Sequence, residues 1–188
     1  TVSGNLTLSA AAVTLTIADG SGTDLVVASG GVFVNSATTS GGITATGTWQ
    51  IQTGGTYIHN SVTGISTPFD KLTLDAGSTF IYRGSSSLNP AMTLSNRTYQ
   101  NLSFESASGI WATNIGSGTK ALTVNGTLTI GSNVTWTMGS FTGALNFNGD
   151  IDVNGSFAAN NYTVAALKKM SLLGTGNASI NSGNTITV

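Results

Sequence analysis

A nine-residue pattern of alternating apolar and polar side chains around a central glycine constrains the fold of this chain most strongly. Its clearest copy runs from Leu122 to Ile130 and reads LTVNGTLTI. Every apolar side chain in this copy has an even residue number, and Thr or Asn occupies each odd position. Because successive side chains of a strand point to opposite faces, this period of two predicts strands with one dry face and one wet face.

The same pattern recurs along the chain. It matches position for position at 145–153 (LNFNGDIDV) and at 43–51 (ITATGTWQI), and a truncated copy occupies 2–8. The glycine falls in an inward position, where we expect it to let the strand bend without a Cβ clash. A repeat of about 23 residues, with short strands and Gly or Asn turns, is typical of solenoids. The chain is therefore predicted to be all-β, a right-handed parallel β-helix (β-solenoid) with coils of about 23 residues.

We expect a single β-solenoid domain over residues 1–188, which can also be a segment of a longer column. A loop excursion is expected within 61–90, which holds both prolines and four charged residues. Helix is expected only over 165–170, because Thr, Val, Ile, Ser, Asn and Gly are poor helix formers. An antiparallel β-sandwich also uses short alternating strands and stays the alternative fold.

Some of these segments resemble a known class of proteins. One pattern of alternating apolar and small polar residues recurs in three segments: NLTL at 5–8, VNGTLTI at 124–130 and FNGDIDVNG at 147–155. In addition, Tyr-Arg-Gly at 82–84 is followed by Tyr-Gln-Asn-Leu at 99–102. They resemble the repeats of long bacterial surface proteins that are cargo of the type IX secretion system. The resemblance implies a right-handed parallel β-helix on or outside a bacterial cell, in an adhesin, a stalk or an enzyme-carrying scaffold.

The composition excludes several classes of chemistry. The chain has no cysteine and one histidine, and its six Lys or Arg and seven Asp or Glu give a net charge of -1. Without cysteine there is no disulfide framework, thiol nucleophile or Cys-based metal site. No basic cluster favours nucleic-acid binding, and no apolar run reaches the ~20 residues of a membrane helix. We therefore expect no cofactor, no nucleic-acid partner and no membrane insertion.

Two acidic segments are the candidates for catalysis or metal binding. Asp150 and Asp152 are the closest carboxylate pair, and acidic pairs on one sheet serve some β-helix enzymes that cut polysaccharides. The template places both in the outward phase, so we interpret them as part of a solvated row, and we expect no catalytic residue. The segment 19–24 (DGSGTD) has alternating oxygen side chains but too few carboxylates for calcium, so a glycine-rich turn is expected there.

The aromatic residues and the single histidine are the other candidates. Trp49 and Trp136 fall in the inward phase and are predicted to pack in the core. Trp111, together with Tyr82 and Arg83 beside the expected excursion, is a candidate for contact with a glycan or another surface. We interpret His59 as a turn-side or partly buried histidine bonded to a backbone carbonyl, because a metal site would lack further His or Cys ligands.

Repeated Thr-x-Thr pairs raise the hypothesis of an ice- or crystal-binding face. Such a face requires the same pair on one sheet in successive coils, and the template replaces Thr127 and Thr129 by Asp150 and Asp152 one coil later. The simpler interpretation is that threonine suits the wet face of a strand.

The two ends of the chain predict its partners. Neither the segment 1–18 nor the segment 170–188 carries a charge, although charge is the usual protection of an exposed strand edge. We expect end-to-end self-association or continuation in a longer chain, with surface glycans as a further partner. The function expected is a non-catalytic structural or adhesive module of a bacterial surface protein or filament, extracellular or on the cell surface. The alternatives are a polysaccharide-cleaving β-helix enzyme and an ice- or surface-binding solenoid.

Overall fold

The fold is a parallel β-solenoid. A computed structural model describes residues 1–9, 12–37, 42–114, 116–137 and 140–159, and the backbone of the strands at 163–165, 169–172, 177–180 and 185–186. Each strand pairs in parallel with a strand of the next coil, and register partners such as Leu128 and Ile151 are separated by one predicted coil length. The strand direction and the sequence spacing of the partners thus confirm the predicted parallel β-helix and its coil length.

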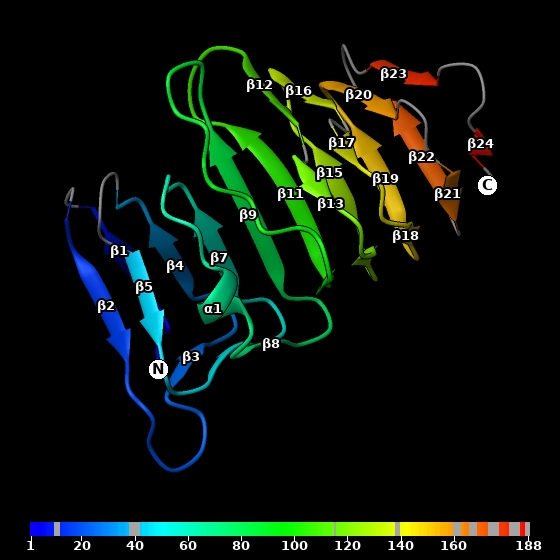
Figure 1. Cartoon of the computed structure of the whole chain (residues 1–188). Coiled ribbons are helices and arrows are strands. Elements are labelled where there is room, and N and C mark those ends of the chain that lie inside the picture. The colour runs from blue at the N-terminus through cyan, green and yellow to red at the C-terminus, as the bar shows by residue number, and fades with distance from the viewer. Residues whose placement is uncertain are drawn as a thin grey trace. The chain divides into compact units, whose positions relative to one another are not determined.

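The chain forms two compact units, of which the first comprises residues 1–83 and 89–93. Its strands form three rows. The rows are β1 (Asn5–Leu8), β4 (Val32–Asn35), β7 (Thr56–His59) and β9 (Thr79–Gly84); β2 (Thr14–Ile17) and β5 (Gly42–Ala45); and β3 (Leu25–Val27), β6 (Trp49–Ile51) and β8 (Leu72–Leu74). Figure 1 shows β2 beside β5 in one row and β4 beside β7 in another. A short helix, α1 (Ser66–Phe69), packs against β5.

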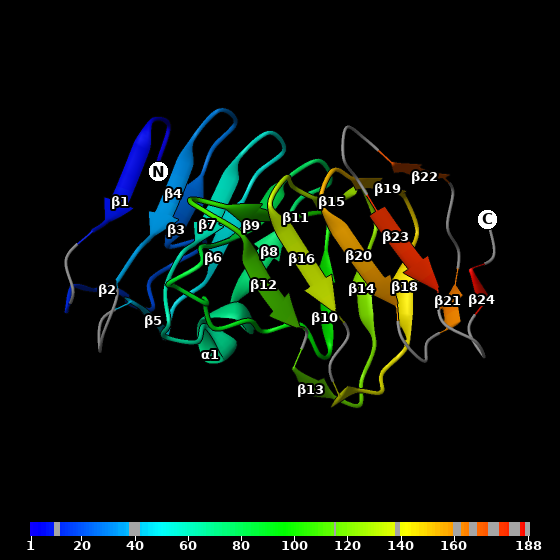
Figure 2. The ribbon, with the colours of Figure 1, turned by 90° about the horizontal axis from the view of Figure 1, so that it is seen from above.

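The second unit comprises residues 84–88 and 94–188. Figure 2 shows its rows. They are β10 (Arg97–Tyr99), β14 (Leu122–Val124), β18 (Leu145–Phe147), β21 (Thr163–Ala165) and β24 (Thr185–Ile186); β11 (Asn101–Ser106), β15 (Leu128–Ile130), β19 (Asp150–Val153) and β22 (Lys169–Leu172); β12 (Trp111–Asn114), β16 (Val134–Thr137), β20 (Ser156–Ala159) and β23 (Asn177–Ile180); and the short pair β13 (Ser117–Gly118) and β17 (Ser140–Phe141).

The alternation of the template sets which side chains are buried. All eight apolar residues of its two best copies are at most 1% exposed: Leu122, Val124, Leu128, Ile130, Leu145, Phe147, Ile151 and Val153. The core of the first unit is aromatic, and the ring of Tyr57 lies 5.2 Å from Phe33 and 4.9 Å from Phe80 in the coils before and after it. Stacking of like positions in successive coils therefore builds a continuous core in each unit.

The expected loop excursion is shorter than 61–90. β8 and β9 lie wholly inside that range and pair with β6 and β7, so within 61–90 the chain leaves the strand rows around α1 and again after Gly84. The helix expected over 165–170 is wrong where the structure describes it, because residue 165 ends β21 and residues 169 and 170 begin β22, while 166–168 lie outside the described residues. Parallel pairing with the preceding coil overrides the local helix propensity.

The template glycines serve close approach between coils, which differs from the bend expected of them. A Cβ added at Gly149 would overlap the carbonyl group of Gly126 in the preceding coil, and one added at Gly47 would overlap the carbonyl oxygen of Ala18. Neither has a positive φ. Gly4, in the first coil, has nothing within 4 Å of such a Cβ. The side chain is therefore excluded by the neighbouring backbone and not by the glycine's own conformation.

We predict that Gly149→Ala lowers the free energy of unfolding by about 2 kcal/mol or more, because the neighbour it meets is backbone and cannot rotate away. Gly4→Ala is the matched control and should change that free energy by less than about 0.5 kcal/mol. Urea unfolding of the two variants measures both effects. Equal stability of both variants would contradict the close stacking of the coils at Gly149.

Candidate functional site

The acidic pair Asp150 and Asp152 lies on the outer face of β19. It alternates with Ile151 and Val153, which are fully buried, so its outward phase is confirmed. Both residues are half-buried, whereas a solvated row would leave them exposed, because β15 and β22 flank them on either side. The register places Thr129 opposite Asp152 in the preceding coil, and Lys169 opposite Asp150 in the following one. The pair thus belongs to a mixed polar row.

The two tryptophans with a clear template phase lie in the interior. Trp49 and Trp136 are fully buried, as predicted, and the Trp49 indole N–H donates to the carbonyl oxygen of Pro68 at 2.6 Å. Trp136 lies 4.9 Å from Phe104 and stacks on Phe157 at 5.1 Å, between ring centroids. These two rings are therefore core and have no face for a ligand.

Trp111, Tyr82 and Arg83 do not form the exposed contact surface that was predicted for them. Trp111 is 1% exposed and Tyr82 is fully buried, so an exposed ring is wrong for both, and only Arg83 is half-buried. The reason is phase: Trp111 is an inward position of β12, two residues before the buried Thr113, and Tyr82 follows the buried Phe80 at the same spacing. Tyr82 also uses its hydroxyl to accept from the backbone N–H of Thr93 at 3.0 Å.

A row of polar side chains crosses the core of the first unit. The register places Asn35, His59 and Tyr82 opposite one another in successive coils, and each is fully buried. His59 is therefore an interior residue of β7, which corrects the expected turn-side or partly buried position. Its Nδ1 lies 3.1 Å from the hydroxyl oxygen of Tyr57. Burial lowers the pKa of His59 to about 4, and burial raises the pKa of Tyr57, so both groups are neutral near pH 7.

Sequence reasoning missed this polar row. The signal was present as spacing, since positions 35, 59 and 82 follow one another at close to one coil length. Ser61 extends the polar interior, because its hydroxyl donates to the carbonyl oxygen of Ala37 and accepts from the N–H of Thr63. The row adds hydrogen bonds to the interior of this unit, yet it is closed to solvent and presents no surface for a substrate.

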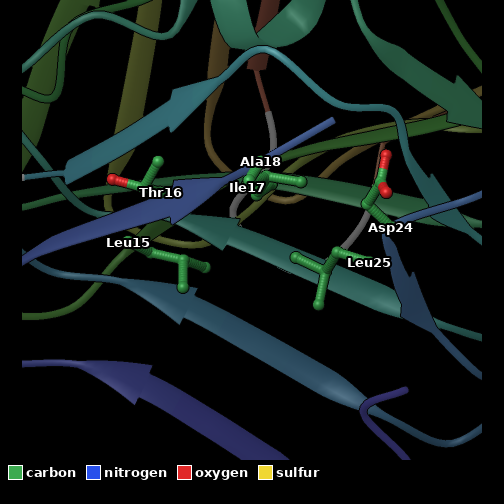
Figure 3. Close-up of a pocket in the computed structure, with 6 residues that line it drawn as sticks. All are labelled: Leu15, Thr16, Ile17, Ala18, Asp24 and Leu25. Atoms are coloured by element: carbon green, nitrogen blue, oxygen red, sulfur yellow. The ribbon is translucent and has the colours of Figure 1, made fainter. Parts of the chain in front are cut away.

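A hollow of about 250 Å³ lies on the first coil of the first unit. Its lining residues all come from positions 15–25: Leu15, Thr16, Ile17, Ala18, Asp24 and Leu25. Figure 3 shows the side chains of Leu15 and Leu25 projecting to one side and the Asp24 carboxylate to the other. Asp24 Oδ2 accepts from the backbone N–H of Thr48 at 2.8 Å, so the carboxylate ties the turn to the next coil.

No group of three or more His, Cys, Asp or Glu side chains that could hold a metal ion occurs within the described part of the chain. The segment 19–24 connects β2 and β3 as a turn, as predicted, although its Asp24 bonds the next coil and not its own backbone. None of the helices among the residues described in the structure is long and apolar enough to span a membrane.

The threonine pairs do not form a long flat face in the described rows. Thr44 and Thr16 stand opposite each other on β5 and β2, with their hydroxyl oxygens 3.2 Å apart. That row holds two strands, and α1 follows it. On β15 and β19 the predicted interruption is confirmed, since Thr129 is followed by Asp152.

Comparison with known proteins finds no relatives: no family model, no curated protein and no solved structure matches this chain.

Proposed function

We propose that this chain is an extracellular structural and adhesive module of a bacterial surface protein or filament, and that it acts without catalysis. The observation that carries the proposal is a set of outward rows of polar, mostly uncharged side chains that hydrogen-bond from one coil to the next. The likeness of its repeats to surface proteins of the type IX secretion cargo kind supports a place on or outside the cell.

These lateral bonds recur at the coil spacing. Asn148 Nδ2 donates to Asn125 Oδ1 at 2.8 Å, and Asn146 Nδ2 donates to Thr123 Oγ1 at 3.4 Å, each one coil back along the chain. In the first unit Gln50 Nε2 donates to both carboxylate oxygens of Asp75 at 2.9 Å. Each bond fixes a side chain of one coil against the next, in addition to the backbone ladder, and so stiffens the stack.

The same rows suit a polar surface partner. Amide and hydroxyl groups both donate and accept hydrogen bonds, as the hydroxyls of glycans do. Since these rows carry little charge, contact through them should depend weakly on salt, unlike contact between opposite charges. The proposed partner of the flank is therefore a neutral surface glycan.

A retention assay tests this function. We expect the immobilised chain to retain neutral polysaccharide equally in dilute buffer and in molar sodium chloride, and to release no new reducing ends. A matched variant, Asn148→Asp, loses the amide that donates to Asn125 and should reduce retention to a similar degree at low and high salt, because a neutral glycan carries no charge for the new carboxylate to repel. Absence of retention of every polysaccharide offered would contradict the adhesive role.

The enzyme alternative predicts a different result in the same assay. Cleavage of an acidic or neutral polysaccharide by the parent chain, lost in Asp150→Asn or Asp152→Asn, would contradict the non-catalytic function. Both substitutions replace a half-buried outward carboxylate by its isostere, so they should leave the fold unchanged.

A further inference from the structure

The sequence contains three Asn-Gly pairs, which begin at Asn125, Asn148 and Asn154 and all lie in the second unit. In such a pair the backbone nitrogen of the glycine can attack the side-chain amide of the asparagine, because glycine gives the backbone the freedom to bring the two groups together. The attack requires that the asparagine side chain turn toward that nitrogen and that the glycine N–H leave its own hydrogen bond. The hydrogen bonds of the fold therefore decide which of the three pairs can react.

The first two pairs hold each other's side chains. Asn148 Nδ2 donates to Asn125 Oδ1 at 2.8 Å, so neither amide can turn toward its glycine without losing this bond. The backbone of the first pair is fixed as well, since the N–H of Gly126 donates to the carbonyl oxygen of Gln100 at 2.7 Å. Reaction at either pair must therefore first break a hydrogen bond between coils.

The third pair has no such side-chain partner in the preceding coil. Asn154 directly follows β19, which pairs with β15 and lies beside it in Figure 1. Since Ile130 and Val153 are register partners, the residue opposite Asn154 is Gly131, which has no side chain to bond its amide. Among the described residues none forms a hydrogen bond with the side chain of Asn154, which is half-buried. Within the described structure this amide is therefore free to turn toward Gly155.

The backbone of the third pair is also held less tightly. The N–H groups of Asn154 and Gly155 donate to one acceptor, the carbonyl oxygen of Ile130, at 2.8 and 3.2 Å. The bond from Gly155 is at the long end of the usual N–H···O range, whereas the bond from Gly126 is at its short end. The Gly155 nitrogen therefore loses less when it leaves its bond and attacks the Asn154 side chain.

We propose that Asn154 is a site of spontaneous deamidation in the folded chain, and that Asn125 and Asn148 are protected by the bond they share. The Gly155 nitrogen forms a bond to Cγ of Asn154, and the bond from Cγ to Nδ2 breaks, so that ammonia leaves with the proton of the Gly155 N–H. The succinimide ring that remains reacts with water, which opens it to aspartate or to isoaspartate. Water is the only co-reactant that this modification needs.

The product changes the outer row of β19. Position 154 continues the alternation of Asp150 and Asp152, so an aspartate there places a third carboxylate in line with them, directly after the strand. The isoaspartate product also lengthens the backbone by one methylene group between β19 and β20. The modification therefore gives the module a negative charge that accumulates with age at a defined position.

The chain contains its own controls for this reaction, because all three pairs have the same two residues. We expect incubation of the folded chain in mildly alkaline buffer to convert Asn154 at least about five-fold faster than Asn125 or Asn148, the ratio that corresponds to one hydrogen bond of about 1 kcal/mol. In guanidinium chloride, which unfolds the chain, the three rates should be similar. Tandem mass spectrometry of proteolytic peptides measures each rate.

Two variants separate protection by the fold from local sequence. Asn125→Ala removes the acceptor of the Asn148 amide and should raise the rate at Asn148 several-fold, while the rate at Asn154 stays unchanged. Asn154→Gln is the matched control, because it keeps an amide and should abolish the fast conversion without changing the other two rates.

Four results would overturn the proposal. They are equal rates at the three sites of the folded chain, faster conversion at Asn125 or Asn148, an Asn154 that reacts only after unfolding, and an Asn125→Ala chain in which Asn148 reacts no faster than in the parent.

Discussion

Replacing Trp111 by alanine should lower the free energy of unfolding by about 4 kcal/mol, the usual cost of truncating a buried tryptophan. The indole is 1% exposed and lies against Gly84, where an added Cβ would overlap the ring. It also packs 6.2 Å from the ring of Phe104, between centroids. Its site is therefore shaped to the indole, and neighbouring backbone cannot collapse into the space that alanine leaves. Urea unfolding measures the loss.

The neighbouring residue provides the control. Ile110 is 66% exposed, and Ile110→Ala should change stability by less than about 0.5 kcal/mol. Comparing Trp111→Ala with Ile110→Ala also distinguishes a core role of Trp111 from a sugar-binding role. If the indole were a sugar platform, Trp111→Ala would keep the parent's stability and lose retention of polysaccharide, which is the outcome that the buried position contradicts.

Acid should destabilise the first unit through His59. The pKa of His59 is about 4 in the folded chain, below its ordinary value of 6.5, because burial penalises the charged ring. The unfolded chain therefore binds the proton first as pH falls. The contribution of His59 to the free energy of unfolding is fully present above about pH 6.5. It decreases between pH 6.5 and 4 and levels off below that. The expected loss between pH 7 and pH 4 is about 3 kcal/mol.

His59→Gln isolates this contribution. Glutamine can donate to or accept from the hydroxyl of Tyr57, whose oxygen lies 3.1 Å from Nδ1 in the parent, but it does not titrate. The side chains around His59 are Asn35, Tyr57 and Tyr82, and the two tyrosines are neutral throughout this range. Urea unfolding of both proteins from pH 7 to pH 4 gives the difference between their free energies of unfolding. Because both proteins have the same carboxylates, the contribution of those groups is removed from this difference. Parallel stability curves would show that His59 does not stay neutral in the fold.

The fold could be predicted because the repeat determines face and register together. Once Leu128 and Ile151 occupy equivalent template positions, a parallel register follows, and a slip of one residue would turn Thr129 and Asp152 inward. The template also places Trp49 and Trp136 correctly. It fails at Trp111 and Tyr82, which lie outside any template copy, so no template position assigns their phase.

Other features depend on contacts between coils that no local pattern encodes. α1 replaces a strand beside β5, and the carbonyl oxygen of Pro68 in that helix accepts from the indole of Trp49. The polar row of Asn35, His59 and Tyr82 is invisible to a hydrophobic pattern, because burial of these side chains depends on their neighbours one coil away. The glycine requirement likewise depends on the backbone of the preceding coil, as at Gly149.

The proposed function depends on outward rows that stay in register from coil to coil, and paired cysteines test that register directly. The chain has no cysteine of its own. Thr123 and Asn146 are register partners, so their Cα atoms should be about 4.8 Å apart, within the range of a disulfide. Asn148 is two residues further along the strand direction, about 8 Å from Thr123 and out of that range.

We expect the variant with Thr123→Cys and Asn146→Cys to form an intramolecular disulfide under mild oxidation in dilute solution. The variant with Thr123→Cys and Asn148→Cys should stay reduced, and mass spectrometry distinguishes the two states. Disulfide formation in the first variant alone is the result that in-register rows predict. Equal oxidation of both variants, or of the second alone, would contradict the register and with it the structural role built on these rows.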